Sequence, residues 1–64
     1  MTNSFELTIC SIFPHDYVYY ECNDEGLQTI NVYHNDTGIS EVLGVGKDEA
    51  EAAYDAVKKL GQNG

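Results

Sequence analysis

The stretch GVGKDEAEAAYDAVKKLG, residues 44–61, decides the fold, because it carries the signals of a complete amphipathic helix. Asp48 is suited to cap the helix N-terminus, and Glu51 three residues later completes a variant of the capping box. Two lysines occupy the last turn, where the helix dipole favours cations, and Gly61 is suited to end the helix. The pattern predicts a helix from about 49 to 60.

The expected helix carries one apolar stripe along one side. Its members recur at helical spacing and are Ala50, Ala53, Tyr54, Val57 and Leu60. Such a stripe packs against another element of the fold. Because alanine is small, Ala50 and Ala53 are expected to let the helix approach a sheet closely.

Upstream of the helix, alternating apolar residues and turn-forming residues predict short strands. These strands are expected at residues 4–13, 17–22, 27–34 and 39–45, the last at an edge. Pro14 and the turns NDEG and NDTG separate them. The order predicts an α+β fold, an antiparallel three- to four-stranded sheet with one C-terminal helix packed on one face. A chain of 64 residues is expected to form a single domain, 1–64.

The same alternation divides the strand residues between two faces of the sheet. The face under the helix is expected to carry Leu7, Ile9, Val18, Tyr20, Ile30 and Val32. The open face is expected to carry Glu6, Tyr17, Tyr19, Glu21, Asn31, Tyr33 and Glu41. Tyrosines among carboxylates are typical of a protein-binding surface. The alternative is an ordinary solvated face with cross-strand tyrosine pairs.

Charge narrows the choice of partner. The chain has eleven acidic residues against three lysines and no arginine, for a formal charge of −8. Nucleic acids and anionic membranes are bound through Lys and Arg, so direct binding of either is not expected. A basic partner protein is favoured by the same negative field. The alternative is that the acidity serves only solubility.

The acidic residues are expected to gather at one end of the sheet. In a meander of strands, the NDEG turn and the start of the helix share an end, which brings together Asp24, Glu25, Asp48, Glu49 and Glu51. Asp55 on the helix extends this acidic surface. Because turns and helix starts favour Asp and Glu in any case, a purely structural origin is the alternative.

No catalytic, metal or cofactor site is expected. The serines and histidines have no nucleophile context, and His15 and His34 are interpreted as surface residues. Cys10 and Cys22 do not have metal-ligand spacing with the histidines and are expected to be free thiols. The N-terminus lacks a signal-peptide pattern and no stretch is long enough to span a membrane, which favours a cytoplasmic protein.

The strands followed by G-x-G-x-D-E-A-E-A-A and an amphipathic helix resemble the C-terminal part of a double-stranded RNA-binding domain. They equally resemble the HicB-type antitoxin domain, which shares that partial fold. The resemblance is sharpest at Gly44, Gly46, Ala50, Ala53 and Leu60. The chain departs from the RNA-binding family by placing acidic residues where that family has lysines at the helix start, and by lacking its first helix. RNA binding is therefore not an implication of the resemblance.

In size and charge the chain also resembles small acidic phage-encoded inhibitors, such as anti-CRISPR proteins and DNA mimics. This resemblance implies a non-enzymatic inhibitor whose acidic surface binds a basic nucleic-acid-binding site on a partner protein, most concretely a CRISPR effector. The chain is expected to be a monomer or a weak homodimer. The alternative is a HicB-like antitoxin or small acidic interaction module.

Overall fold

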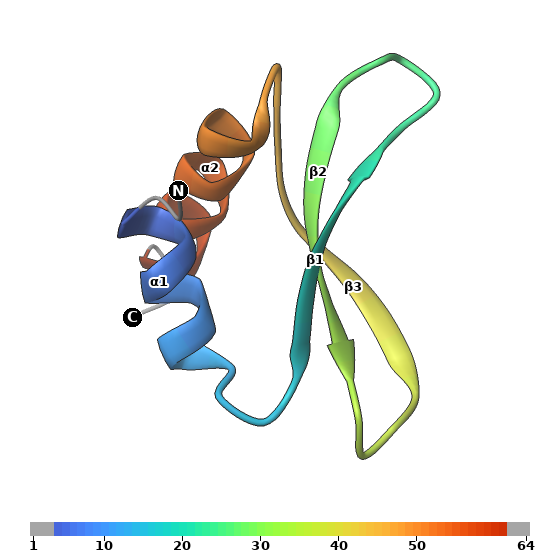
Figure 1. Cartoon of the computed structure of the whole chain (residues 1–64), viewed down its shortest axis with the longest axis vertical. Coiled ribbons are helices and arrows are strands. Elements are labelled where there is room, and N and C mark those ends of the chain that lie inside the picture. The colour runs from blue at the N-terminus through green and yellow to red at the C-terminus, as the bar shows by residue number, and fades with distance from the viewer. Residues whose placement is uncertain (1–3, 62–64) are drawn as a thin grey trace.

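The computed structural model describes residues 4–61. Its elements are α1 (Ser4–Ile12), β1 (Tyr17–Cys22), β2 (Gln28–His34), β3 (Ile39–Gly46) and α2 (Glu49–Gly61). The three strands form one antiparallel sheet in the order β1-β2-β3, with both helices on the same face (Figure 1). The α+β class, the antiparallel sheet and the C-terminal helix are thus confirmed, whereas the first predicted strand is a helix. Within residues 4–61 no helix has the length and apolar character needed to cross a membrane.

Helix α1 replaces the expected N-terminal strand because its apolar residues also fit helical spacing. Phe5, Ile9 and Phe13 recur every four residues; Ile9 is fully buried and the two phenylalanines pack against the core. Leu7, which an alternating strand would bury, is 60% exposed. Pro14 follows the helix closely and disfavours helical backbone in the residue before it. Packing against α2 therefore outweighs the strand propensity of this segment.

Two glycine-containing turns connect the strands and set their register. In the β1–β2 turn, the Asn23 side-chain oxygen accepts a hydrogen bond from the Leu27 backbone at 3.0 Å, and Gly26 has a φ of 80°. In the β2–β3 turn, Gly38 has a φ of 73° and donates its N–H to the His34 carbonyl at 2.8 Å. Glycine adopts this left-handed backbone readily, so both turns form where the sequence predicted them.

The backbone of α2 lies directly against β3 at Gly44 and Gly46. A Cβ atom placed on Gly46 would lie 2.5 Å from the Ala52 nitrogen. One placed on Gly44 would meet the Ala52 carbonyl oxygen and lie 2.5 Å from the Ala56 nitrogen. Real Cβ atoms essentially never come this close to backbone atoms. The helix therefore sits nearer to the strand than any side chain at these two positions would allow.

The face of α2 that packs on the sheet is rotated from the predicted stripe. Ala52 and Ala56 are fully buried, whereas Ala50 is exposed and Tyr54 is 52% exposed. The Tyr54 ring packs edge to face on Phe5 of α1, with ring centroids 5.2 Å apart. Since the two glycines demand the smallest partners, alanines rather than the tyrosine face them. The predicted stripe is confirmed at Ala53, Val57 and Leu60.

A bulge in β3 changes the face that the first half of this strand presents. Asn31 pairs with Val42, while the residue before it pairs with Gly44, so Leu43 is an extra residue in the ladder. Leu43 is 7% exposed and belongs to the core. Because side chains alternate along a strand, one extra residue reverses the order of faces. Glu41 consequently lies on the helix side, not on the open face as predicted.

The glycine contact can be tested with Gly46→Ala. The new methyl group meets backbone atoms of α2, which cannot rotate away as a side chain can, so we expect a loss of about 3 kcal/mol in the free energy of unfolding. Because a domain of this size is only marginally stable, complete unfolding of the variant would also agree with the prediction. Urea unfolding followed by far-ultraviolet circular dichroism measures the change.

Gly61→Ala is the matched control, because a Cβ atom at Gly61 has nothing within 4 Å and the residue lies at the end of α2 without a positive φ. It should leave stability unchanged or raise it by at most about 1 kcal/mol. Equal unfolding midpoints for Gly46→Ala and the unmodified chain would contradict the close approach of α2.

Candidate functional site

Within residues 4–61 the structure contains no pocket and no group of three or more His, Cys, Asp or Glu placed to hold a metal ion. Cys10 on α1 and Cys22 at the end of β1 are both free and exposed. The candidate site must therefore be built from exposed side chains on the molecular surface.

Two acidic residues predicted to bind a partner cap the start of α2. The Asp48 side chain accepts a hydrogen bond from the Glu51 backbone at 2.8 Å, and Glu51 accepts one from the Lys47 backbone at 3.1 Å. The Asp48 hydrogen bond is the one expected of the predicted capping box, whereas the Glu51 side chain reaches one residue further back, to the N–H of Lys47 before the cap. Both carboxylates therefore stabilise the helix N-terminus, whatever else they contact.

Asp55, also predicted to bind a partner, joins α2 to the edge of the sheet. Its carboxylate accepts a hydrogen bond from the Val45 backbone at 3.0 Å and pairs with Lys59 at 2.9 Å. The Val45 hydrogen bond, followed by that of Lys59, lowers the pKa of Asp55 from its usual 3.8. Since β3 is an edge strand, this carboxylate satisfies a backbone N–H that no neighbouring strand pairs.

A second group of carboxylates takes no part in helix capping or in hydrogen bonding at the sheet edge. Within residues 4–61, the structure gives no side-chain hydrogen bond or ion pair to Glu21, Asp24, Glu25, Asp36 and Glu49. All five side chains are exposed. Their charges are consequently available to a partner, and we call them the available carboxylates.

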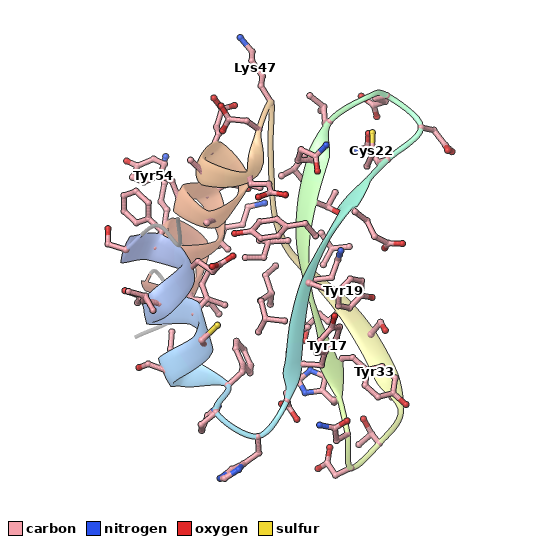
Figure 2. The ribbon with its side chains drawn as sticks, in the orientation of Figure 1. Tyr17, Tyr19, Cys22, Tyr33, Lys47 and Tyr54 are labelled. Carbon is pink, nitrogen blue, oxygen red and sulfur yellow. The ribbon has the colours of Figure 1, made fainter. Side chains whose placement is uncertain are left out.

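The acidic end has the predicted topology but a wider layout than expected. Gln28 pairs with Gly46, so the β1–β2 turn with Asp24 and Glu25 lies at the same end of the sheet as the start of α2. Figure 1 shows this turn leaning away from the helix start. Lys47 projects from the chain between β3 and α2 at that end (Figure 2). The five carboxylates predicted there therefore form two groups.

The face of the sheet that lacks helices, here called the open sheet face, is a grid of three rows. The strand register gives the rows as Tyr17, Tyr33 and Ser40; Tyr19, Asn31 and Val42; and Glu21, Thr29 and Val45. The labelled tyrosines of these rows project away from the helices (Figure 2). The predicted placement of Tyr17, Tyr19, Glu21, Asn31 and Tyr33 on this face is thus confirmed. Glu6, the other residue expected here besides Glu41, lies in the first turn of α1.

His34 takes part in a cluster that sequence reasoning missed. Its Nδ1 lies 3.0 Å from an Asp16 carboxylate oxygen and its Nε2 lies 3.2 Å from a Glu41 oxygen. Asp16 also accepts a hydrogen bond from the Asn35 backbone at 3.3 Å, and the Phe13 ring packs edge to face on the imidazole. The cluster joins the α1–β1 loop to β2 and β3. The two carboxylates lie at opposite nitrogens, so they do not converge on one point.

Strand alternation could have predicted that His34 lies on the helix side of the sheet. His34 lies two residues after the buried Val32 and therefore on the helix side. A histidine with a carboxylate at each nitrogen donates to both only when doubly protonated. The Glu41 hydrogen bond first, and then that of Asp16, raises the pKa of His34 above 6.5.

The raised pKa predicts a pH dependence of stability. The stabilisation that protonated His34 provides is complete below its unfolded pKa of about 6.5 and is lost as pH rises through the higher folded pKa. The difference in unfolding free energy between the unmodified chain and His34→Gln should therefore be larger at pH 5.5 than at pH 8.5. Denaturant unfolding at both pH values measures it.

Glu41→Gln is the companion variant, because it removes the acceptor that contributes most to the shift and keeps the histidine. Its pH dependence should be intermediate between those of the unmodified chain and His34→Gln. A difference between the unmodified chain and His34→Gln that is the same at both pH values would show that folding does not raise the pKa of His34.

Comparisons with protein-family models, with curated proteins and with solved structures found no match for this chain. The structure has an N-terminal helix, α1, in a segment for which no helix was expected. Asp48, Glu49 and Glu51 lie in the first turn of α2 or at its cap, as the sequence predicted.

Proposed function

We propose that the chain is a non-enzymatic inhibitor whose acidic surface binds a basic, nucleic-acid-binding site on a partner protein. The concrete version is an anti-CRISPR protein that blocks DNA recognition by a CRISPR effector in the cytoplasm of the host cell. The observation that carries the proposal is the set of available carboxylates, which are exposed and bound to nothing else within residues 4–61.

The distribution of positive charge supports a basic partner. All three lysines fall between residues 47 and 59, in the segment before α2 and in α2 itself. The strands and α1 therefore carry no lysine or arginine to neutralise the negative field. Carboxylates pair with arginine as phosphates do, so an acidic surface competes with nucleic acid for the same groups. Long-range attraction also accelerates the encounter.

The alternative function is a HicB-like antitoxin or a small acidic interaction module, acting as a monomer or weak homodimer. The open sheet face favours this alternative, because it offers aromatic contact area away from the acidic end. The two functions differ in which surface determines affinity, and this difference can be measured.

The test replaces three available carboxylates at the acidic end, Asp24→Asn, Glu25→Gln and Glu49→Gln together. Asp48, Glu51 and Asp55 are kept because the fold uses them. We expect unchanged folding, a roughly tenfold slower association with the partner and a flatter dependence on salt. The measurement is surface plasmon resonance on a panel of purified CRISPR effectors, with a gel shift of each effector on its target DNA as the functional readout.

Two controls separate the possibilities. The isolated protein should not retard duplex DNA or RNA at physiological salt, because it lacks a basic surface. Replacing Lys58 by Gln makes the net charge one unit more negative, at the other end of α2 and without breaking the Lys59–Asp55 ion pair, and should not slow association. If no effector loses DNA binding, or if the acidic variant inhibits as well as the unmodified chain, the mimicry proposal is wrong and the interaction module is favoured.

A further inference from the structure

Three tyrosines lie together on the open sheet face. Tyr17 and Tyr19 stand side by side on β1, with ring centroids 5.6 Å apart and ring planes inclined by 17°. Tyr33 lies directly opposite Tyr17 on β2. Tyr17 is 64% exposed and Tyr33 is 38% exposed, so both side chains are accessible to a ligand.

The aromatic array rests on an ordered polar layer. Asn31 is 2% exposed and Thr29 is 7% exposed, although no helix covers this side of the sheet. The Asn31 amide donates to the Thr29 hydroxyl at 3.1 Å, and that hydroxyl donates to the Glu21 backbone carbonyl at 3.3 Å. Neighbouring side chains of the grid must therefore fold over these two residues. A surface packed in this way loses little conformational entropy when it binds.

Charge restricts what can lie on these rings. Nucleic-acid bases stack on tyrosine, but their phosphates would meet a chain of charge −8 with no Lys or Arg in the sheet. A second copy would bring another −8 onto the same face. An anionic lipid surface is opposed for the same reason. A cationic segment of another protein is the occupant that this field attracts.

Arginine suits the surface better than lysine does. The planar guanidinium stacks on aromatic rings and forms two parallel hydrogen bonds with a carboxylate. Glu21, an available carboxylate, lies two residues after Tyr19 on the same face, roughly 7 Å along the strand. Val42, which is 60% exposed in the same row as Tyr19, adds apolar surface for the methylene stem.

We propose that the open sheet face binds arginine side chains of a partner protein, which stack on Tyr17, Tyr19 and Tyr33 and pair with Glu21. The proposal rests on the function proposed above, and it names the chemical group that the partner must present. It also gives the tyrosine face and the acidic surface complementary roles, since one recognises the guanidinium plane and the other attracts its charge.

The test is a ¹⁵N heteronuclear NMR titration of the full chain with two capped peptides of equal length, one alternating Arg and Gly and the other Lys and Gly. We expect the arginine peptide to bind at least about threefold more tightly, as a cation–π contact at an exposed site allows. The largest shifts should fall on Tyr17, Tyr19, Tyr33 and Glu21. A single-stranded oligouridylate is the nucleic-acid probe and should cause no shift.

Variants assign the effect to the face. Tyr17→Thr keeps strand propensity and removes the most exposed ring, so it should weaken arginine binding about threefold, while Tyr17→Phe keeps the ring and the affinity. Tyr54→Leu removes a half-exposed ring on the helix side and should change nothing in the titration. Glu21→Gln should reduce the preference for arginine over lysine. The dispersion of the NMR spectrum verifies folding in each case.

Equal affinity for the two peptides, or full affinity in Tyr17→Thr, would overturn the proposal, as would binding of the oligouridylate at this face. The titration needs no target protein, so its outcome is independent of inhibition. An arginine preference without any inhibited effector would support this inference and reject the proposed function. An inhibited effector without an arginine preference would support the proposed function and reject this inference.

Discussion

The contact between the backbone of α2 and the two glycines of β3 is the constraint on which the rest of the structure depends. Because no side chain separates them, Ala52 and Ala56 fill the interface and a short chain can build a core from small residues. The same closeness brings Asp55 within reach of the Val45 backbone. It also leaves Tyr54 on the outer side of α2, where Phe5 of α1 packs on it. The position of α1 therefore follows from the contact between α2 and β3.

Features with a local cause could be predicted from the sequence, and features decided by packing could not. The cap at Asp48, the turns at Gly26 and Gly38, and three strands follow from residues next to one another. Helix α1 was missed because its apolar residues fit both a strand and a helix, and only the presence of α2 distinguishes them. The rotation of α2 was missed because helical spacing placed Tyr54 in the apolar stripe without regard to size, whereas the glycines of β3 select by size. No residue near Leu43 indicates a bulge in β3, so the sequence predicted unbroken alternation along this strand. The bulge places Glu41 on the opposite face from the one predicted.

The candidate site likewise combines features that could be predicted from the sequence with features that depend on packing. The tyrosine rows were predicted because β1 and β2 are regular and alternation is reliable there. The topology correctly placed two acidic segments at one end, but their separation depends on how the β1–β2 turn leans, which the sequence does not encode locally. Capping and edge protection occupy Asp48, Glu51 and Asp55, so a count of acidic residues overstates the charge that is available. The His34 cluster needed both the face assignment and the bulge, since Glu41 reaches it only from the helix side.

The uneven placement of lysine has a consequence for proteolysis. Trypsin cleaves after lysine and arginine, and this chain offers only Lys47, Lys58 and Lys59. Helix α1 and all three strands therefore remain in one uncut fragment, while the exposed Lys47 lies at the junction of the sheet and α2. A single cut at this junction separates the two sides of the α2–β3 contact, with Gly44 and Gly46 on one fragment and Ala52 and Ala56 on the other. The two fragments then form a natural pair for complementation, held together by the backbone contact, the Val45–Asp55 hydrogen bond and the packing of α1 on α2.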